Sequence, residues 1–457
     1  MSAAVVLGGS VDALVAARLL ARAGRRVTVL NEGLAPRNFE DGWVAPQILS
    51  ELRLEATITR SDPWASAVLP DGGSLELWQD MDRTVESLRR LSPRDAAKWP
   101  DFCRRMAALA RVFEEMYSAP PINPLNLGLA FRVRRLGRQG MEDLMRILPM
   151  SVAELLDDWF ECDALKGALG AMGILQLQQG PRSGGTAFRL LHHHVGSPPG
   201  VFRPPRCNLG AVLRAIPGVE MRGAAIARIS VRGGRVAGVV LTSGEEIETA
   251  LVVSGLDPRR TLLELADSGW LDPELARAAG HIRRRGVVAK LFFKAPGARN
   301  AVLAPSLDYL EQAYDDVKYG RVSRRPYLEA QASEGAAEVH FQYAPYRRED
   351  GEWNTARRSA LAELTRRMLP ALGDAEASVL APPDLEAREG WPEGQAYHAE
   401  LSLDQALWMR PLPELAQYRT PLEGLWLCGP GMHPGGAIPG AAGYHCACAL
   451  LAQLSKR

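Results

Sequence analysis

The turn GGSVDA, residues 8–13, contains residue types that suit the binding of a phosphate. Gly8 and Gly9 allow a sharp bend, and Ser10 precedes a run that is typical of a helix. The unpaired N–H groups at the start of a helix, together with its dipole, favour an anion. The turn therefore predicts either a nucleotide-binding site or an ordinary strand-to-helix turn without a ligand.

Each glycine of a dinucleotide-binding turn has its own task. The first permits the bend, the second lets the backbone approach the pyrophosphate, and the third allows helix and strand to pack closely. Here Gly8 takes the first position, Ser10 the second and Ala13 the third. Ser10 is a departure, because its side chain crowds the phosphates, although its hydroxyl could donate to them. Asp12 lies in the first helical turn, where its charge suits the helix dipole but repels a phosphate.

Two neighbouring residues compete for the role of holding a ribose. Asn31 directly follows the apolar run 27–30, and Glu32 comes one residue later. In dinucleotide-binding units an acidic side chain at this point accepts hydrogen bonds from the ribose hydroxyls. The sequence leaves open which of the two faces the ligand.

A second glycine-rich turn lies near the carboxyl terminus. It follows an apolar run at 425–428, precedes an Ala- and Leu-rich run, and has glycines at 429, 431, 435, 436, 440 and 443. Open backbone N–H groups at a helix start suit an anion or the polar edge of a ring. We expect a strand, this turn and a closing helix.

His193 and His433 are the candidate catalytic residues. His192, His193 and His194 are adjacent, and neighbours on a helix or a strand point in different directions, so at most two can converge on one site. His433 lies inside the second glycine-rich turn. A structural or exposed role is the alternative for these histidines.

No metal site and no disulfide framework are predicted. The six cysteines, at 103, 162, 207, 428, 446 and 448, include no C-x-x-C pair. Cys446 and Cys448 flank an alanine in a run of Ala and Leu, which favours small core thiols over ligands. A reducing compartment, and hence the cytoplasm, is the expected location.

Several elements must position these residues. Residues 4–7 and 27–30 have the pattern of buried strands, and Val11 to Ala23, followed by Gly24, has that of a helix. Residues 219–255 alternate apolar and polar positions and predict a β-meander that returns to a buried strand at 251–253. The long regions 61–200 and 266–415, which combine helical and Pro-rich segments, are interpreted as insertions that form a separate layer.

Composition excludes several classes of function. The chain has 457 residues, 54 Lys and Arg against 53 Asp and Glu, and a formal net charge of +1. This balance gives no field that would attract nucleic acid. No run of 18 apolar residues occurs, and the apolar amino terminus lacks a basic region, so neither a membrane span nor a secretory signal is expected.

Long collinear motifs resemble the phytoene-desaturase-like flavoprotein oxidoreductases, especially the branch of pyridine nucleotide-disulphide oxidoreductase domain proteins. The motifs are LMRILPMSVAELLDDWFECDALKGAL (144–169), GPRSGGTAFRLLHHHVG (180–196), LDYLEQAYDDVKYGRVSRRPYLEAQ (307–331), FQYAPYR (341–347) and SLDQALWMRPLPELAQYRTPLEGLWLCGPGMHPGG (402–436). The resemblance covers nearly the whole chain. It implies an α/β, two-domain flavoprotein fold: a Rossmann-like FAD domain with a β-meander, and an inserted α+β substrate domain.

The resemblance also implies domain ranges and site residues. Residues 1–60, 200–265 and 416–457 would form the discontinuous FAD domain, and 61–199 and 266–415 the substrate domain. The turn from Gly8 through Gly9 and Ser10 to Ala13 would face the pyrophosphate, and Glu32 or Asn31 the ribose. The other cofactor-binding positions would be Ile226 near the adenine, and Gly429, Gly431, Gly436 and Ile438 along the ribityl chain and ring. His433 would lie beside the ring, and His193 would line the site.

Departures from the family pattern concentrate in the FAD site. Besides Ser10 and Asn31, residues 31–55 lack the usual glycine pair and are shortened. Two lost charge-assisted hydrogen bonds, at roughly 1.5–3 kcal/mol each, would weaken FAD binding by roughly 10²–10⁴. We expect an FAD-dependent oxidoreductase that takes a hydride from an apolar or lipid-like substrate. The alternative is a flavin-deficient homologue that serves as a non-catalytic partner or scaffold subunit of an active flavoprotein.

Residues 125–140 interleave apolar residues with arginines. Such a pattern suits peripheral contact with a membrane that supplies a lipid substrate. A surface for a protein partner or a second copy of the chain, and a plain solvated segment, are the other interpretations. The apolar spacing of two residues is not that of an amphipathic helix.

Overall fold

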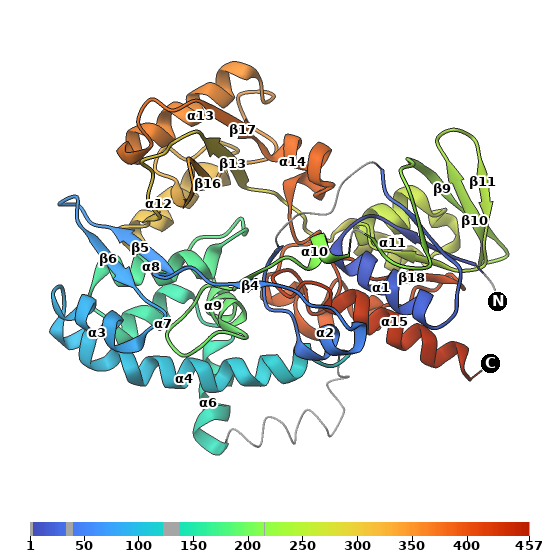
Figure 1. Cartoon of the computed structure of the whole chain (residues 1–457), viewed down its shortest axis with the longest axis horizontal. Coiled ribbons are helices and arrows are strands. Elements are labelled where there is room, and N and C mark those ends of the chain that lie inside the picture. Colours follow the sequence, from blue (N-terminus) through green and yellow to red (C-terminus); the bar gives the residue numbers. More distant parts are fainter. Residues whose placement is uncertain (1–2, 33–39, 122–136, 214, 457) are drawn as a thin grey trace.

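The computed structural model describes residues 3–32, 40–121, 137–213 and 215–456 (Figure 1). Both ends of the described chain lie in the same part of the molecule, beside a parallel sheet. A second, larger sheet lies on the other side. Between them runs the cleft described below.

Five parallel strands form the first sheet. They are β1 (Ala4–Leu7), β2 (Val27–Leu30), β8 (Val219–Arg222), β12 (Val252–Ser254) and β18 (Leu425–Leu427), in the order β18-β12-β1-β2-β8. All residues of β1, β12 and β18 are buried. Because parallel strands are covered on both faces, they consist of continuous apolar runs, and this allowed four of them, β1, β2, β12 and β18, to be located from sequence.

Two helices bring the glycine-rich turns together on this sheet. Helix α1 (Val11–Arg22) begins at Ser10, whose Oγ accepts the N–H of Ala13 at 3.3 Å. Gly24 follows the helix at φ +81°, as expected of a residue that ends one. Helix α15 (Ala441–Leu454) packs on α1 so closely that a Cβ at Gly443 would lie 1.8 Å from the carbonyl oxygen of Asp12.

The β-meander is confirmed in its centre and differs at its start. Strands β9 (Ile226–Arg232), β10 (Arg235–Leu241) and β11 (Glu246–Glu248) are antiparallel neighbours. Residues 219–222, however, form β8 and pair in parallel with β2. β8 is a largely exposed edge strand, and alternation alone does not distinguish such a strand from a member of a meander.

Seven strands form the second sheet, contributed by two distant stretches of chain. In the order β17-β13-β16-β15-β14-β5-β6 they are β17 (Ala377–Leu380), β13 (Val288–Phe293), β16 (Ala336–Gln342), β15 (Tyr327–Ser333), β14 (Ala301–Leu303), β5 (Ala65–Val68) and β6 (Ser74–Leu77). All neighbours are antiparallel except β5 and β14.

Helices surround the second sheet. They are α3 (Met81–Arg89), α4 (Pro93–Tyr117), α6 (Gly137–Ile147), α7 (Val152–Trp159), α8 (Asp163–Ile174), α9 (Thr186–His194), α12 (Leu307–Lys318), α13 (Thr355–Met368) and α14 (Pro382–Glu389). The long helix α4 runs across the lower part of the molecule in Figure 1, above α6. α9, which carries the three adjacent histidines, packs against both α4 and α8.

Short elements connect the two parts. A small antiparallel sheet joins β3 (Glu40–Asp41), β7 (Arg206–Cys207) and β4 (Ile58–Thr59). The remaining helical elements are α2 (Pro46–Leu52), α10 (Leu209–Val212), the π-helix η1 (Arg260–Leu265), α11 (Pro273–Gly280), and the 3₁₀ turns η2 (Ser268–Trp270), η3 (Pro370–Leu372), η4 (Pro392–Gly394), η5 (Leu403–Gln405), η6 (Leu407–Met409) and η7 (Pro413–Leu415).

The strands of the first sheet lie in the ranges predicted for the FAD domain, and those of the second sheet in the ranges predicted for the substrate domain. One large hydrophobic core continues from the first sheet into the helices around α9. The exact ends of the two domains stay a prediction.

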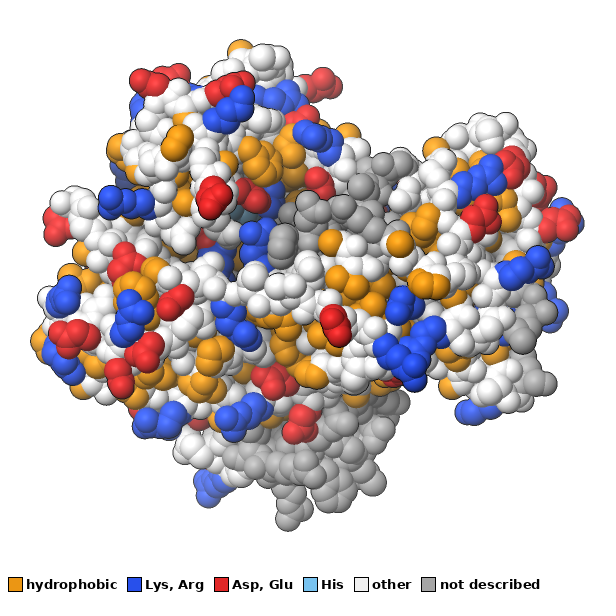
Figure 2. Space-filling view, in the orientation of Figure 1, with side chains coloured by type: hydrophobic (Ala, Val, Ile, Leu, Met, Phe, Trp, Pro, Cys, Tyr) orange, Lys and Arg blue, Asp and Glu red, His pale blue; other side chains and the backbone are white. Residues whose placement is uncertain are grey.

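Basic and acidic side chains are interspersed over the face shown in Figure 2. None of the helices in the described part of the chain combines the length and apolarity needed to cross a bilayer. Most of the segment 125–140 lies outside the described residues, so its expected membrane contact stays a prediction.

Candidate active site

A single cleft connects the two glycine-rich turns with the second sheet. The space between its walls is about 1770 Å³, a figure that includes the part open to solvent. On one side it is lined by Gly8, Gly9, Ser10, Val11, Asp12, Glu32, Gly435, Gly436, Ala437, Ile438 and Pro439. On the other it is lined by Arg203, Arg206, Lys290, Glu329, Gln331, Glu338 and His340.

The amino-terminal turn lines this cleft with Gly8 to Asp12, and the N–H of Gly8 itself donates to the carbonyl of Leu30 at 2.7 Å. Gly8 has a φ of +91°, where a side chain would be strained, and its Cβ would lie 3.0 Å from Leu256. The hydroxyl oxygen of Ser10 caps α1, which leaves the hydroxyl proton available to a ligand. Asp12 is buried, and its carboxylate accepts the N–H of Gly443 at 3.3 Å. One Asp12 carboxylate oxygen thus faces α15, which accounts for an acid in this turn.

Glu32, and not Asn31, lines the cleft. Arg260 of η1 donates to both carboxylate oxygens of Glu32, at 2.6 and 3.1 Å. The backbone N–H of Ile226 lies 3.4 Å from the same carboxylate. A carboxylate can accept about four hydrogen bonds, so capacity remains for a ribose hydroxyl. Arg260 was not predicted, because it is distant in sequence and meets Glu32 only in the fold.

The second glycine-rich turn divides into packing positions and cleft positions. Gly429 and Gly431 do not line the cleft; a Cβ there would lie 2.4 Å from the carbonyl oxygen of Gly255 and 2.7 Å from Pro258. Gly436 and Ile438 do line it. A Cβ at Gly436 would lie 1.7 Å from the ring of Tyr397, so only glycine fits beneath that ring.

Ala13 also has a packing role. Its Cβ would lie 2.6 Å from a Cβ built on Gly255, at the end of β12. A small residue is therefore needed where α1 crosses this strand. That is the task expected of the third position of the turn, and it requires no contact with a ligand.

The two candidate catalytic histidines do not line the cleft. His193 is fully buried; its Nδ1 donates to the carbonyl of Met172 at 2.8 Å, and its Nε2 lies 3.2 Å from Nη2 of Arg189. Burial, followed by the charge of Arg189, holds the pKa of His193 well below its ordinary value. His433 is also buried, and desolvation, followed by the charge of His445, lowers its pKa to about 3. Both are placed as neutral core histidines.

His192 bonds to a residue that lines the cleft. Its Nε2 donates to the carbonyl of Gly436 at 2.6 Å, which leaves Nδ1 to accept the hydroxyl of Tyr117 at 2.8 Å. Burial keeps its pKa well below the ordinary value, so it is neutral. The histidine thereby holds the backbone of the second turn in place.

Sequence reasoning missed the polar row on the second sheet. Lys290 of β13 and Glu329 of β15 both lie opposite His340 of β16 in the strand register. Lys290 pairs with Glu338, and Glu329 pairs with Arg203 and accepts the hydroxyl of Tyr327 at 2.8 Å. Single charged residues inside otherwise apolar strands were the available signal, but their alignment depends on strand pairing.

His340 has a defined tautomer. Its Nε2 donates to Oε1 of Gln342 at 3.1 Å, because the Gln342 amide nitrogen is committed to the carbonyls of Ile174 and Leu177. Nδ1 therefore carries the lone pair. Burial lowers the pKa of His340 to about 4, so this nitrogen is an acceptor at neutral pH.

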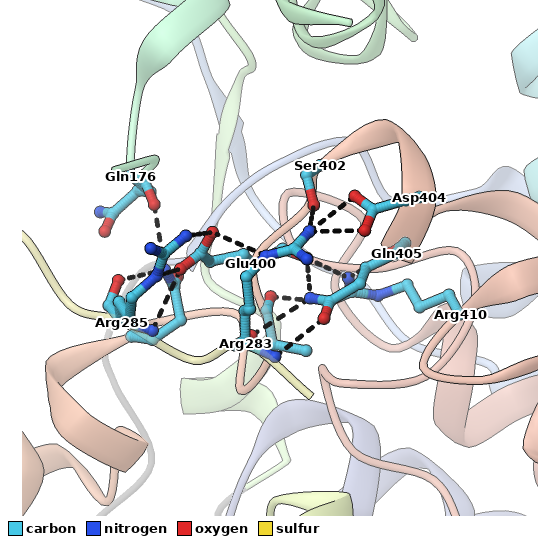
Figure 3. Close-up of polar contacts among 10 residues, drawn as sticks. Gln176, Arg283, Arg285, Glu400, Ser402, Asp404, Gln405 and Arg410 are labelled. Carbon is cyan, nitrogen blue, oxygen red and sulfur yellow. Dashed lines mark hydrogen bonds and ion pairs between the residues drawn. The ribbon is translucent and has the colours of Figure 1, made fainter. Parts of the chain in front are cut away.

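A polar network holds the segment that carries Tyr397. The fully buried Glu400 accepts Nε and Nη2 of Arg285 at 2.7 and 3.0 Å. Figure 3 shows its carboxylate between Arg285 and Arg283, with Asp404 on the far side of the Arg283 guanidinium. Arg410 lies fully buried beside them and bonds to the backbone of the same segment. Tyr397 is thus held over Gly436 by its own backbone.

The described residues also include no group of three His, Cys, Asp or Glu side chains arranged to hold a metal ion. The cysteines of α15 lie in its packed interior or beside Tyr444 and carry raised pKa values, in each case mainly because of burial. Thiols in this state are poor ligands and poor nucleophiles.

Known proteins resemble this chain in sequence and in fold. The family described as flavin-containing amine oxidoreductase matches residues 207–451. Pyridine nucleotide-disulfide oxidoreductase domain-containing protein 2 of Rattus norvegicus is 27% identical, over 97% of this chain and 92% of its own. A neurosporene-forming phytoene desaturase of Cereibacter sphaeroides is 23% identical, over 96% and 92%. The crystal structure of an oxidoreductase from Methanosarcina mazei superposes with a TM-score of 0.59 at 14% identity, over 98% and 99%. The predicted fold class is confirmed.

Proposed function

The chain belongs to the family of flavin-containing amine oxidoreductases, and on this premise we propose that it is an FAD-dependent oxidoreductase acting on a lipid-like substrate. The observation that carries the proposal is the single cleft that joins a helix start, an acidic residue and a glycine-rich turn to a separate, polar sheet. The predicted resemblance to the phytoene-desaturase-like branch is confirmed by the relatives.

The residues along one side of the cleft fit FAD. The backbone at Gly8 to Val11 would face the pyrophosphate, where the start of α1 favours negative charge. Glu32, beside Ile226, would accept from the ribose hydroxyls. Gly436 and Ile438 would border the ring, because they line the same cleft as the residues of the second sheet. Ala13 fills the third position of the turn, where a small residue lets helix and strand pack closely.

The other side of the cleft suggests the substrate. Met172, Leu175 and Trp391 supply apolar surface, whereas Lys290 and His340 supply charge and hydrogen-bonding groups. A pure hydrocarbon over the sheet would remove the remaining water from the ion pair of Lys290 without replacing it, which is costly. We therefore propose a substrate with an apolar body and one polar group, the latter over the sheet.

The chain would orient this substrate and exclude water from it. Bound flavin supplies a two-electron acceptor that takes up the hydride as a substrate C–H bond breaks. Loss of a proton from the adjacent substrate atom completes the oxidation. His340, neutral because its pKa is about 4, would accept a hydrogen bond from the polar group at Nδ1, and the proton would be released to solvent through the open part of the cleft.

Flavin binding is tested with a pair of glycine variants. Gly8→Ala should lower FAD affinity at least tenfold, because φ is +91° and the added Cβ enters a packed turn. Gly72→Ala is the matched control, since φ is +84° and the added Cβ meets nothing within 4 Å. Titration of the purified apoprotein with FAD, followed by flavin fluorescence, measures both. Equal FAD affinities of the Gly8→Ala and Gly72→Ala variants would argue against this cleft as the flavin site. Absence of FAD binding in the wild type would overturn the proposed function.

Substrate polarity is tested by anaerobic bleaching of the bound flavin. A long-chain alcohol should reduce it faster than phytoene does, and His340→Phe should abolish that preference. Faster reduction by phytoene would contradict the polar group and favour a purely apolar substrate.

One observation favours the second candidate function, that of a non-catalytic partner subunit. The Glu32 carboxylate is already engaged by Arg260, which competes with a ribose. A chain that purifies without flavin, in a stable complex with a flavin-bearing homologue, would support this role. A flavin-loaded chain that turns over substrate alone would exclude it.

A lipid-like substrate would reach the cleft from a membrane surface or a carrier protein. We propose the segment 125–140 for peripheral membrane contact, on the basis of its apolar residues and arginines. Sedimentation with anionic vesicles, compared between the wild type and a variant with its four arginines at 132, 134, 135 and 138 changed to Gln, measures it. Equal sedimentation would leave a protein partner or self-association as the role of this segment.

A further inference from the structure

Arg189 of α9 is a fully buried guanidinium with unused hydrogen-bond donors. Its Nη2 donates to the carbonyl of Leu175 at 2.7 Å and to Nε2 of His193 at 3.2 Å. Nε and Nη1 have no hydrogen-bond partner of good geometry among the described residues, although the guanidinium also interacts with the Tyr397 phenol. Of its five N–H groups, those on Nε and Nη1 are therefore not matched by well-formed hydrogen bonds.

The charge of Arg189 is also unbalanced. The groups that favour its protonated state are the phenols of Tyr397 and Tyr117, and no described carboxylate forms an ion pair with it. Its histidine neighbours are neutral, because burial lowers the pKa values of both His192 and His193. A buried charge without a counter-charge is energetically costly. Such charges are found mainly where function requires them.

One layer of side chains separates Arg189 from the cleft. Leu175, Met172 and Tyr397 all line the cleft. Leu175 accepts from Arg189 directly, and Met172 accepts from its partner His193. The Tyr397 ring lies 5.4 Å from the Arg189 guanidinium carbon and is packed against Gly436. Arg189 is therefore buried behind Tyr397, at the part of the cleft where the proposed flavin ring would lie.

We infer that Arg189 is the positive charge that stabilises negative charge on the flavin ring as the ring accepts the hydride lost by the substrate carbon. This inference rests on the proposed function. A cation in a region of low dielectric acts on a neighbouring charge with little screening. Protein charges placed near the ring are a principal means of tuning flavin chemistry. The burial of Arg189 behind Tyr397 leaves its guanidinium with few hydrogen bonds. The same position would raise the reduction potential of a bound flavin.

The test compares Arg189→Met with the wild type and with Arg366→Met. Arg366 donates to the carbonyl of Ala375 and lies over Phe293, away from the cleft, so its variant controls for loss of an arginine side chain. The thermal midpoint of the apoprotein and the reduction potential of bound FAD are measured for each.

Arg189→Met should leave the apoprotein midpoint equal to or above that of the wild type, because an unbalanced buried charge is removed. It should make flavin reduction at least tenfold less favourable, a fall of about 30 mV for a two-electron couple. Arg189→Lys, which keeps the charge, should retain most of the potential, and Arg366→Met should not change it. Arg189→Gln is neutral and provides the same measurement if the Met variant does not fold.

An unchanged potential in a flavin-loaded neutral variant would overturn the inference and leave the proposed function intact. A lowered apoprotein midpoint with unchanged potential would assign Arg189 a structural role. A wild type that takes up no FAD would overturn both proposals.

Discussion

Arg410 and Arg189 are both fully buried arginines, and neither forms an ion pair among the described residues, yet their surroundings differ. Arg410 donates through all three of its nitrogens to six backbone carbonyls, at 2.9 to 3.2 Å. Arg189 leaves two nitrogens without a hydrogen-bond partner of good geometry. A buried cation whose donors are used holds the chain together, whereas one with few well-formed hydrogen bonds can act on a nearby ligand through its charge.

The difference follows from the elements around each arginine. Arg410 lies among irregular segments and short turns, and the carbonyls that it bonds belong to residues 397–405 and 430–432. Arg189 lies on a helix against other helices, whose carbonyls are already satisfied. Burial alone therefore does not separate a structural arginine from a functional one. The count of satisfied donors does.

The largest expected effect is that of Arg410→Met. Removal of the guanidinium takes a donor from six buried carbonyls, of which, among the described residues, that of Glu400 alone keeps a second donor, Nε2 of Gln405, and this should lower the free energy of unfolding by about 4 kcal/mol. Urea unfolding followed by circular dichroism measures it. Arg410→Lys, whose side chain has fewer donors, should have a free energy of unfolding between those of the wild type and Arg410→Met. A loss below about 1 kcal/mol would remove the distinction between the two arginines.

Glu400→Gln should have the next largest effect, because it weakens the network beside Arg410. The Glu400 carboxylate is fully buried between Arg283 and Arg285, and its loss should cost about 3 kcal/mol. Asp404→Asn is the matched control. Asp404 pairs with the same Arg283, but its side chain is 61% exposed, so the loss should be at most about 1 kcal/mol. Equal losses in urea unfolding would show that burial is not the deciding factor.

The smallest expected effect is a difference in how the stability around the two arginines depends on pH. The acceptors of Arg410 are carbonyls that do not titrate, whereas one acceptor of Arg189 is Nε2 of His193. The pKa of His193 lies well below 6.5 in the folded chain, so below about pH 6.5 the unfolded chain binds a proton that the folded chain does not. Stability from this residue is present above that pH and is lost as the pH falls.

The measurement compares unfolding at about pH 7.5 and about pH 5.5. The wild type should lose about 1.4 kcal/mol more than His193→Gln does over this interval. Arg410→Met should show the same pH dependence as the wild type, because none of the six acceptors of Arg410 titrates. Equal pH dependence in the wild type and His193→Gln would contradict the assignment of a neutral, buried His193.

Local patterns predicted most of the dinucleotide-type part of the fold. The strands at 4–7 and 27–30 and the helix between them have nearly the predicted limits, because continuous burial and a glycine helix end leave strong local signals. β8 was assigned to the wrong sheet, because pairing with β2 is decided between distant segments. The extent of FAD-site degeneracy stays a prediction, since residues 33–39 lie outside the described chain.

The amino-acid sequence by itself determined the strands and helix of the amino-terminal unit, the two glycine-rich turns, and the position of Asn31 and Glu32 directly after the second strand. Those features depend on neighbours within a few residues and on backbone conformations that only certain side chains allow. Only the tertiary structure decided that Glu32 meets Arg260, that Lys290, Glu329 and His340 share a row, and that Tyr397 covers Arg189. These contacts join residues far apart in the chain, and the free energy of each depends on burial and on satisfied hydrogen bonds, which a sequence pattern does not contain.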